Sequence, residues 1–482
     1  MLNRSLEKSG MHLRHLASIL FIHALAFCAG TASADETFRV VNSGAPGPQV
    51  PLSSLSGVEH QIRTHDRRIF LELVKLAEFN VLYQQTVNHR ARWRDVFYPL
   101  GQEAAYACYL GYSLTDISQR SRGWNDPGII SPTTTKRALS AAAVGALLGS
   151  TSSVVELTAN GVEAVRAKQR GFSVRESVDF VQSTVNRVDD MLATRHALMQ
   201  EVEFTGTRRE LLELKEELLK YETDRLVFEF KRWSAHSRGY FWYSNAFYLI
   251  NATVNMGRFS AVQLGLKSFT NPRCSGATGP VLIASACLAG VGPIASSTVG
   301  NCVQRYQKRL LSKKLPISPF LSDSEARQKF ERLAQLLASN ETNNQQGQLA
   351  SELIRLRKEK IGLDTLIVHE DRKIERLRRV AGQQTITAPM ISSLGVGSGI
   401  LNTIGYYGYR QQPLINNKLG FAASATIIPA ETVALIATPA AAMAAYRYER
   451  NLKRKGEHPE QLLSTRLEDL KTLEKLVSDA WR

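Results

Sequence analysis

The stretch Cys274–Gln304, CSGATGPVLIASACLAGVGPIASSTVGNCVQ, contains no charged residue over 31 positions. A membrane-spanning helix needs about 20 mainly apolar residues, so this stretch is long enough to cross a bilayer. Its many Ala, Gly, Ser and Thr residues are typical of helices that pack closely against one another in membranes. The same composition also fits tight hairpins inside a soluble protein, or re-entrant hairpins, and both remain alternatives.

Similar tracts recur in a fixed order along the 482 residues. A basic cluster and a first apolar segment are followed by a short loop, a second apolar segment, a basic exit and an amphipathic helix. This order repeats three times at a period of roughly 145 residues, which indicates an internal triplication. The first segments are Val96–Thr115, Gly239–Gly257 and Val380–Tyr409, and the second segments are Ala138–Val155, Cys274–Gln304 and Leu419–Tyr446.

The pattern predicts an all-α integral membrane protein with three tandem helical-hairpin units, about six membrane helices, and long amphipathic or coiled-coil helices on one side. Unit 1 covers residues 57–200 with its apolar hairpin at 96–155. Unit 2 covers 201–345 with a hairpin at 239–304, and unit 3 covers 346–482 with a hairpin at 380–446.

The polar stretches between the hairpins carry helical periodicity. Val174, Val178, Val181, Val185, Val188 and Leu192 are spaced alternately by four and three residues, which is a heptad seam. Comparable seams occur in 211–221, 326–337, 349–366 and 463–477. We expect antiparallel coiled-coil pairs, with an ordinary amphipathic bundle as the alternative. Three start signals support these helices: the capping boxes Ser173/Glu176 and Ser322/Glu325, and Pro459 at a first helical turn.

The N-terminus predicts export. Residues 1–14 are basic, residues 16–30 are apolar, and Ala32-Ser33-Ala34 forms a small-residue cleavage site, so 1–34 is interpreted as a signal peptide. An uncleaved anchor and an organellar presequence are the alternatives. Residues 35–56 are expected to be a flexible linker. The predicted location is the bacterial inner membrane, multi-pass, with the long helices in the periplasm.

The charge distribution conflicts with that orientation. The chain has a formal net charge of +16, and its basic clusters flank the apolar tracts on the long-helix side rather than at the short loops. Positively charged flanks usually lie in the cytoplasm. The conflict disappears if these clusters bind anionic lipid head groups. The basic residues form no stripe with interleaved aromatics, and we therefore expect no nucleic-acid partner.

Three ionisable residues lie within or beside apolar tracts: Glu103, Arg258 and Glu431. Charges at membrane depth are costly and usually face a partner or a water path. Asn251 and Asn255 precede Arg258 at spacings of four and three, which places all three on one helix face. These five residues form the candidate intramembrane polar path. Polar glue between helices, a solute or ion path, and interfacial placement are the three interpretations.

No catalytic, cofactor-binding or metal-binding motif is recognisable, and the five cysteines are interpreted as small buried hydrophobes. We expect a non-enzymatic scaffold or assembly factor that associates with itself or with a protein partner through its helices. The alternative is a channel or transporter for an ion or small solute that uses Glu103, Arg258 and Glu431. A membrane-associated enzyme is the third possibility.

Overall fold

A computed structural model describes residues 55–87, 93–202, 204, 206–317, 323–339, 388–389, 391–456 and 458–479. The predicted signal peptide, most of the predicted linker, Ser322 of the second capping box and the seam at 349–366 lie outside these residues.

Every regular element in these ranges is a helix. The long helices are α2 (Leu55–Val87), α3 (Arg94–Arg122), α4 (Pro132–Gln169), α5 (Val174–Glu201), α6 (Thr207–Lys267), α7 (Ser275–Lys314), α8 (Asp323–Ser339), α10 (Pro413–Arg454) and α11 (Pro459–Asp479). Residues 391–409 are also helical. Two short 3₁₀ helices, η1 (Pro127–Ile129) and η2 (Pro272–Cys274), lie in connections.

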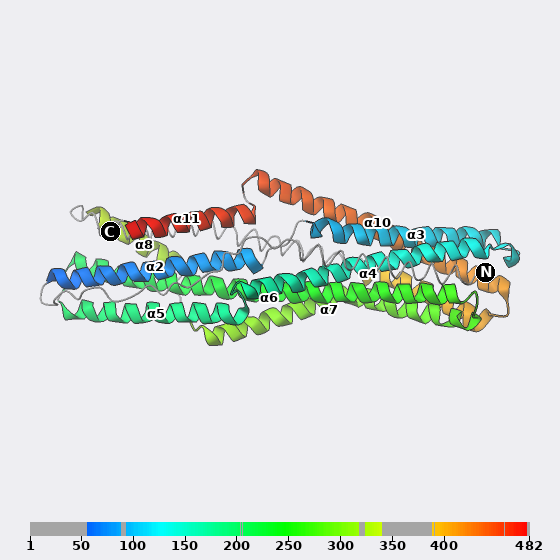
Figure 1. Ribbon diagram of the computed structural model, residues 1–482, viewed down its shortest axis with the longest axis horizontal. Coiled ribbons are helices and arrows are strands. Elements are labelled where there is room, and N and C mark those ends of the chain that lie inside the picture. The colour runs from blue at the N-terminus through cyan, green and yellow to red at the C-terminus, as the bar shows by residue number, and fades with distance from the viewer. Residues whose placement is uncertain are drawn as a thin grey trace.

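The helices form one elongated rod along α6 (Figure 1). This helix has 61 residues and is therefore about 90 Å long. We call the end built from α2, α5, α8, α11 and residues 207–238 of α6 the head. The hairpin half consists of α3, α4, residues 239–267 of α6, the first part of α7, the helix over 391–409, and the first part of α10. The level where the two meet is called the waist.

Local sequence sets the helix ends. Ser173 accepts a hydrogen bond from the backbone N–H of Glu176 at 3.3 Å, which confirms the first predicted capping box. Pro459 begins α11, as predicted. Gly171 follows α4 with φ at +81°, a conformation that favours glycine, and it turns the chain from α4 into α5.

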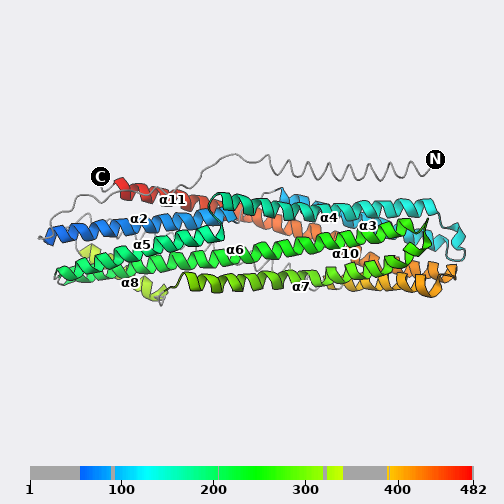
Figure 2. The ribbon, with the colours of Figure 1, turned by 60° about the horizontal axis from the view of Figure 1, so that its bottom comes forward.

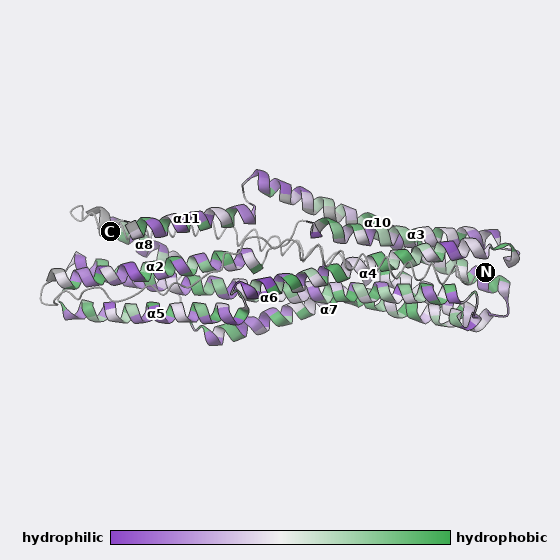
Figure 3. Ribbon diagram, in the orientation of Figure 1, coloured by the Kyte–Doolittle hydropathy of each residue, from purple (hydrophilic) through white to green (hydrophobic). Residues whose placement is uncertain are grey.

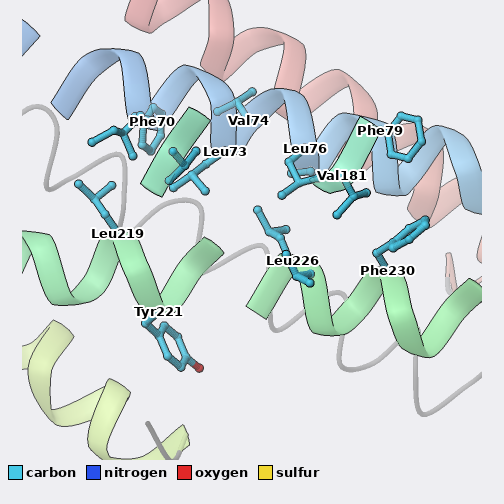
Figure 4. Close-up of a cluster of buried hydrophobic side chains, with 14 of the residues drawn as sticks. Phe70, Leu73, Val74, Leu76, Phe79, Val181, Leu219, Tyr221, Leu226 and Phe230 are labelled. Carbon is cyan, nitrogen blue, oxygen red and sulfur yellow. The ribbon is translucent and has the colours of Figure 1, made fainter. Parts of the chain in front are cut away.

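Large side chains fill the head. Residues of α2, α5, α6, α8 and α11 share one core with the end of α7, and Figure 4 shows side chains of α2 meeting those of α6. The α5 seam contributes Val178, Val181, Val188 and Leu192 to this core, so the predicted apolar face is confirmed. The head therefore combines helices from all three predicted units, while coiled-coil geometry and triplication stay predictions.

Small residues pack the hairpin half. A Cβ placed on Gly300 of α7 would lie 2.8 Å from the Cβ of Tyr243 and 3.0 Å from the carbonyl oxygen of Gly239, both on α6. Gly399 likewise meets the backbone of Gly279 in α7. The three turns after α3, α6 and the 391–409 helix all lie at the end of the rod away from the head (Figures 1 and 2). The polar helices therefore extend in the opposite direction.

Among the residues that the structure describes, length and composition support three membrane helices rather than the predicted six. Within the described residues, three helices are long and apolar enough to cross a membrane, in the ranges Pro132–Glu201, Pro272–Lys314 and Pro413–Ala437. The first two ranges contain α4 and α7, and the third is the first part of α10; these are the second arms of the hairpins. The first arms carry more polar side chains, such as Gln102 and Asp116 of α3, and this lowers their hydropathy.

The cysteine interpretation also needs correction. Cys287 and Cys302 on α7 are exposed, and Cys108 and Cys274 are half-buried. These four cysteines are free thiols that are exposed or half-buried in the hairpin half, and none of them lies in a buried core.

The close α6–α7 crossing predicts a steric effect. Gly300→Ala should lower the free energy of unfolding by about 1–3 kcal/mol, because the added methyl meets backbone and Cβ atoms that cannot move freely. Gly161→Ala on α4 is the control, because a Cβ there meets nothing within 4 Å. That variant should be about 0.5–1 kcal/mol more stable. Thermal unfolding in detergent measures both, and equal effects would contradict the close crossing.

The α2–α11 contact predicts a pH effect. Burial and the neighbouring Glu474 raise the pKa of Glu78 to about 7, against Lys471 and Lys75, which lower it. Because the pKa of Glu78 is higher in the folded state, its protonated side chain contributes fully to the stability of the fold below the unfolded-state pKa near 4.5. This contribution is lost as the pH rises through about 7. At pH 8, Glu78→Gln should therefore slow hydrogen exchange in α11.

Glu72→Gln on the same helix is the matched control, because its partners Arg187 and Lys75 lower the pKa of Glu72 despite burial. This variant should loosen the α2–α5 contact without protecting α11. Faster α11 exchange in Glu78→Gln at pH 8 would show that the carboxylate stabilises the contact.

Candidate functional site: a polar seam among apolar helices

Polar side chains follow one side of α3 through the hairpin half. The members are Arg94, Tyr98, Gln102, Tyr109, Asp116 and Arg120. Their spacings of four and seven residues keep them close to one face of the helix. The residues and their partners on α4, α6 and α10 form what we call the polar seam.

The seam begins at the waist with a buried charge cluster. Arg94 is 2% exposed, and its guanidinium donates to the carboxylates of Glu156 and Glu163, each at 2.7 Å. It also donates to the side-chain oxygen of Asn160, whose amide nitrogen lies 2.7 Å from the side-chain oxygen of Asn245 on α6. One guanidinium thus connects α3, α4 and α6 at a single level.

Neutral hydrogen bonds continue the seam towards the turns. The Gln102 amide donates to the carbonyl oxygen of Gly149 and the hydroxyl of Ser152, both at 2.9 Å and both on α4. The Asn251 amide on α6 donates to the Tyr98 hydroxyl at 2.8 Å. Each bond joins two different helices.

The middle of the seam contains predicted site residues. The Arg258 guanidinium on α6 lies over the ring of Tyr109 at 5.0 Å and over the ring of Tyr106 at 5.8 Å. The Tyr109 hydroxyl donates to the side-chain oxygen of Asn255 at 3.2 Å. Glu431 of α10 interacts electrostatically with Arg258. An opposite charge is therefore available to Arg258 from a third helix.

The structure thus brings together Asn255, Arg258 and Glu431 around α3, and Asn251 lies one turn away against Tyr98. Glu103 is half-buried on α3, directly after Gln102.

The seam ends near the turns with contacts between α3 and α10. Asp116 accepts hydrogen bonds from Arg120 at 2.6 Å and from the Ser424 hydroxyl at 2.7 Å. The Asn417 amide donates to the carbonyl oxygens of Arg120 at 3.0 Å and Gly123 at 2.8 Å. These bonds fix the register of the first part of α10 along α3.

The seam is suited chemically to holding helices together. Interhelical hydrogen bonds in membranes are worth about 0.6–2 kcal/mol each, and their larger value lies in selecting one register. No group of three His, Cys, Asp or Glu side chains suited to a metal ion occurs among residues that the structure describes.

Sequence reasoning missed Arg94, Gln102, Asp116 and Glu156 as seam members. Glu156 adjoins the Ala138–Val155 tract and is fully buried, although a charge at the end of an apolar tract usually meets water. The four- and seven-residue spacing of polar side chains along residues 94–120 is the signal that could have identified Arg94, Gln102 and Asp116.

Comparison with known proteins identifies no relative of this chain. The sequence matches no protein-family profile, and neither the curated proteins nor the solved structures contain a significant match.

The contacts of Arg94 at the waist predict that its two acidic partners contribute very unequally to the free energy of unfolding. Glu156→Ala leaves the buried Arg94 with one carboxylate and should cost about 3–5 kcal/mol. Glu163→Ala removes a carboxylate that is 27% exposed, and it should cost about 1 kcal/mol or less. Unfolding in detergent of Arg94→Met, Glu156→Leu and the double variant measures the coupling between the two side chains. Additive effects would mean that the pair does not connect α3 to α4.

Proposed function

We propose that the hairpin half is embedded in a bacterial inner membrane and that the head stands in water as a non-enzymatic scaffold or assembly module. The supporting observation is the uneven distribution of exposed apolar side chains between the two halves of the rod. Only two of the large exposed hydrophobic side chains in the described ranges, Phe228 and Leu476, belong to the head. The others lie in the hairpin half or at its boundary, including Leu249, Ile294 and Ile436.

Such a surface is unfavourable in water. Large contiguous apolar areas on a protein mark an interaction with protein or membrane. Leu249, Ile294 and Ile436 are 59%, 49% and 65% exposed, and they lie on three different helices, α6, α7 and α10. Apolar surface on several outer helices favours lipid over a single protein partner. Figure 3 shows hydrophobic residues along the helices of this half, with hydrophilic residues between them.

Aromatic side chains mark two ends of this surface. Trp242 and Tyr306 are exposed at the waist, and Trp124 and Tyr407 are exposed near the turns. Aromatic residues are enriched at both membrane–water interfaces. From Trp242 to the end of α6 at Lys267 the helix rises about 38 Å, close to the 40–45 Å of a bilayer with its head groups.

The first arms of the hairpins can accompany α4, α7 and α10 across the bilayer because their polar groups face neighbouring helices. Asn251 and Gln102 each bond to another helix rather than to solvent. In this arrangement all three hairpins return to the head side. The predicted signal peptide supports a periplasmic head.

A scaffold is favoured over a channel because the polar seam is occupied by its own contacts. Tyr109, Asn255 and Arg258 contact one another across α3 and α6, which is the behaviour of glue between helices. A continuous α6 also connects the head rigidly to the hairpin half. The head then presents surfaces for self-association or for a protein partner.

Membrane extraction and protease accessibility test the embedding. Alkaline carbonate should leave the protein in the membrane, because the exposed apolar surface has no comparably favourable place in water. Protease added to spheroplasts should cut the head between α5 and α6. Release by carbonate would contradict embedding, and protection of the head in sealed spheroplasts would contradict its periplasmic placement.

Liposome flux separates the scaffold from the channel. We expect proteoliposomes to pass Na⁺, K⁺ and protons no faster than empty liposomes, because the seam side chains are occupied with one another. Flux that is lost in Glu431→Gln or Glu103→Gln would instead establish the channel. Self-association should be weakened by Leu476→Glu at an exposed head position; buried Val181 is unsuitable because its substitution disrupts the core.

A further inference from the structure

Twelve exposed basic side chains occupy the waist, and we call them the collar. They are Lys168 and Arg170 at the end of α4, Arg305, Lys308, Arg309, Lys313 and Lys314 on α7, and Arg447, Arg450, Lys453, Arg454 and Lys455 at the end of α10. One acidic residue, Glu449, lies within these three stretches of sequence. The collar is therefore a concentrated positive region on an otherwise mixed surface.

The contacts between helices place the α4 and α7 stretches beside the waist, and the α7 stretch extends about 14 Å from Arg305 towards the head. Gly300 of α7 lies against Gly239 of α6, and the α7 collar begins five residues later at Arg305. Asn160 of α4 bonds to Asn245, and α4 then continues towards the head. Figures 1 and 2 show the ends of α7 and α10 on different sides of the rod, so the collar surrounds the waist.

Several exposed cations of the head form ion pairs, whereas the collar cations form none among the described residues. None of the twelve forms an ion pair within the part of the chain that the structure describes. In the head, by contrast, Arg175 pairs with Asp179, Arg209 with Glu213, and Arg327 with Glu331. Near the turns, Lys136 and Lys418 lie over aromatic rings.

The collar lies directly beside the apolar surface. Tyr306 and Tyr446 are each 65% exposed and adjoin Arg305 and Arg447 in sequence, and beyond them the outer surface becomes apolar. In a bilayer that ends at the waist, the collar residues nearest the waist lie beside the phosphate groups of one leaflet, and the others extend from there towards the head. Unpaired Lys and Arg side chains there attract anionic lipids.

We propose that the collar binds anionic phospholipid head groups of the leaflet that faces the head. This inference rests on the proposed membrane embedding and names the ligand: the phosphate of a lipid with a net negative charge, such as phosphatidylglycerol. It gives the basic clusters a role on the head side, and it therefore removes the conflict between the signal peptide and the positive-inside rule.

Tryptophan quenching by brominated lipids tests the proposal. The full chain, with Trp242 as its single tryptophan, is reconstituted in vesicles that contain brominated phosphatidylglycerol or brominated phosphatidylcholine. Trp242 is 42% exposed at the waist. A second single-tryptophan variant of the chain keeps only Trp124, which is 40% exposed near the turns. We expect relative binding of the anionic lipid at Trp242 on the order of tenfold above phosphatidylcholine, weakening with added salt.

Two variants with equal loss of charge make the test specific. The collar variant carries Arg305→Gln, Lys308→Gln, Arg309→Gln and Lys313→Gln, and it should bring the preference at Trp242 close to that at Trp124. The head variant carries Arg175→Gln, Arg209→Gln, Arg327→Gln and Lys475→Gln, all at exposed positions, and it should retain the preference.

The outcomes separate the two proposals. Quenching at Trp242 that is equal for both lipids, or a preference that the collar variant keeps, would overturn lipid binding by the collar while leaving the embedding intact. Absence of quenching at both tryptophans with either lipid would overturn the embedding and the collar together.

Discussion

One continuous helix, α6, passes through two surroundings, and the rest of the structure depends on this constraint. Its first part buries Leu218 and Leu226 in a core of large side chains. Its second part meets α7 through Gly239 and carries Leu249 on the outer surface. The first pattern is that of a protein whose interior is dry and whose exterior is wet. The second suits surroundings that are as apolar as the interior, where close packing and hydrogen bonds must hold helices together.

The polar seam follows from that constraint. In the proposed membrane, burial of leucine would not drive helix association, and the contacts of Arg94 with Glu156 and of Asp116 with Ser424 would supply directional attachment instead. Arg94 and Glu156 are both buried at the waist, and each is partnered by the other. Small residues allow the helices to approach, and the seam decides their register.

Much of the fold was readable from periodicity and uncharged length. The α5 seam and the Ser173 cap lie where the sequence predicts them, because both are local signals. The lengths of the uncharged stretches mark the apolar tracts but overestimate the number of sufficiently apolar helices, because they do not weigh uncharged polar side chains such as Gln102 of α3. Glu156 was missed because the sequence does not show that its carboxylate faces Arg94 of another helix. Which helix a polar side chain faces is a property of packing, and periodicity within one segment does not specify it.

The most direct test of the account uses a native thiol. Cys287 lies on α7 and is exposed on the surface of the folded chain, so lipid is what can shield it from water. In a variant with Cys287 as the single cysteine, a membrane-impermeant maleimide should leave the thiol unmodified in both sealed and opened membranes and should modify it in detergent after denaturation. Modification of Cys287 in opened membranes at the rate of a water-exposed thiol would show that this surface faces water, and the division of the rod into an embedded half and a head would be wrong.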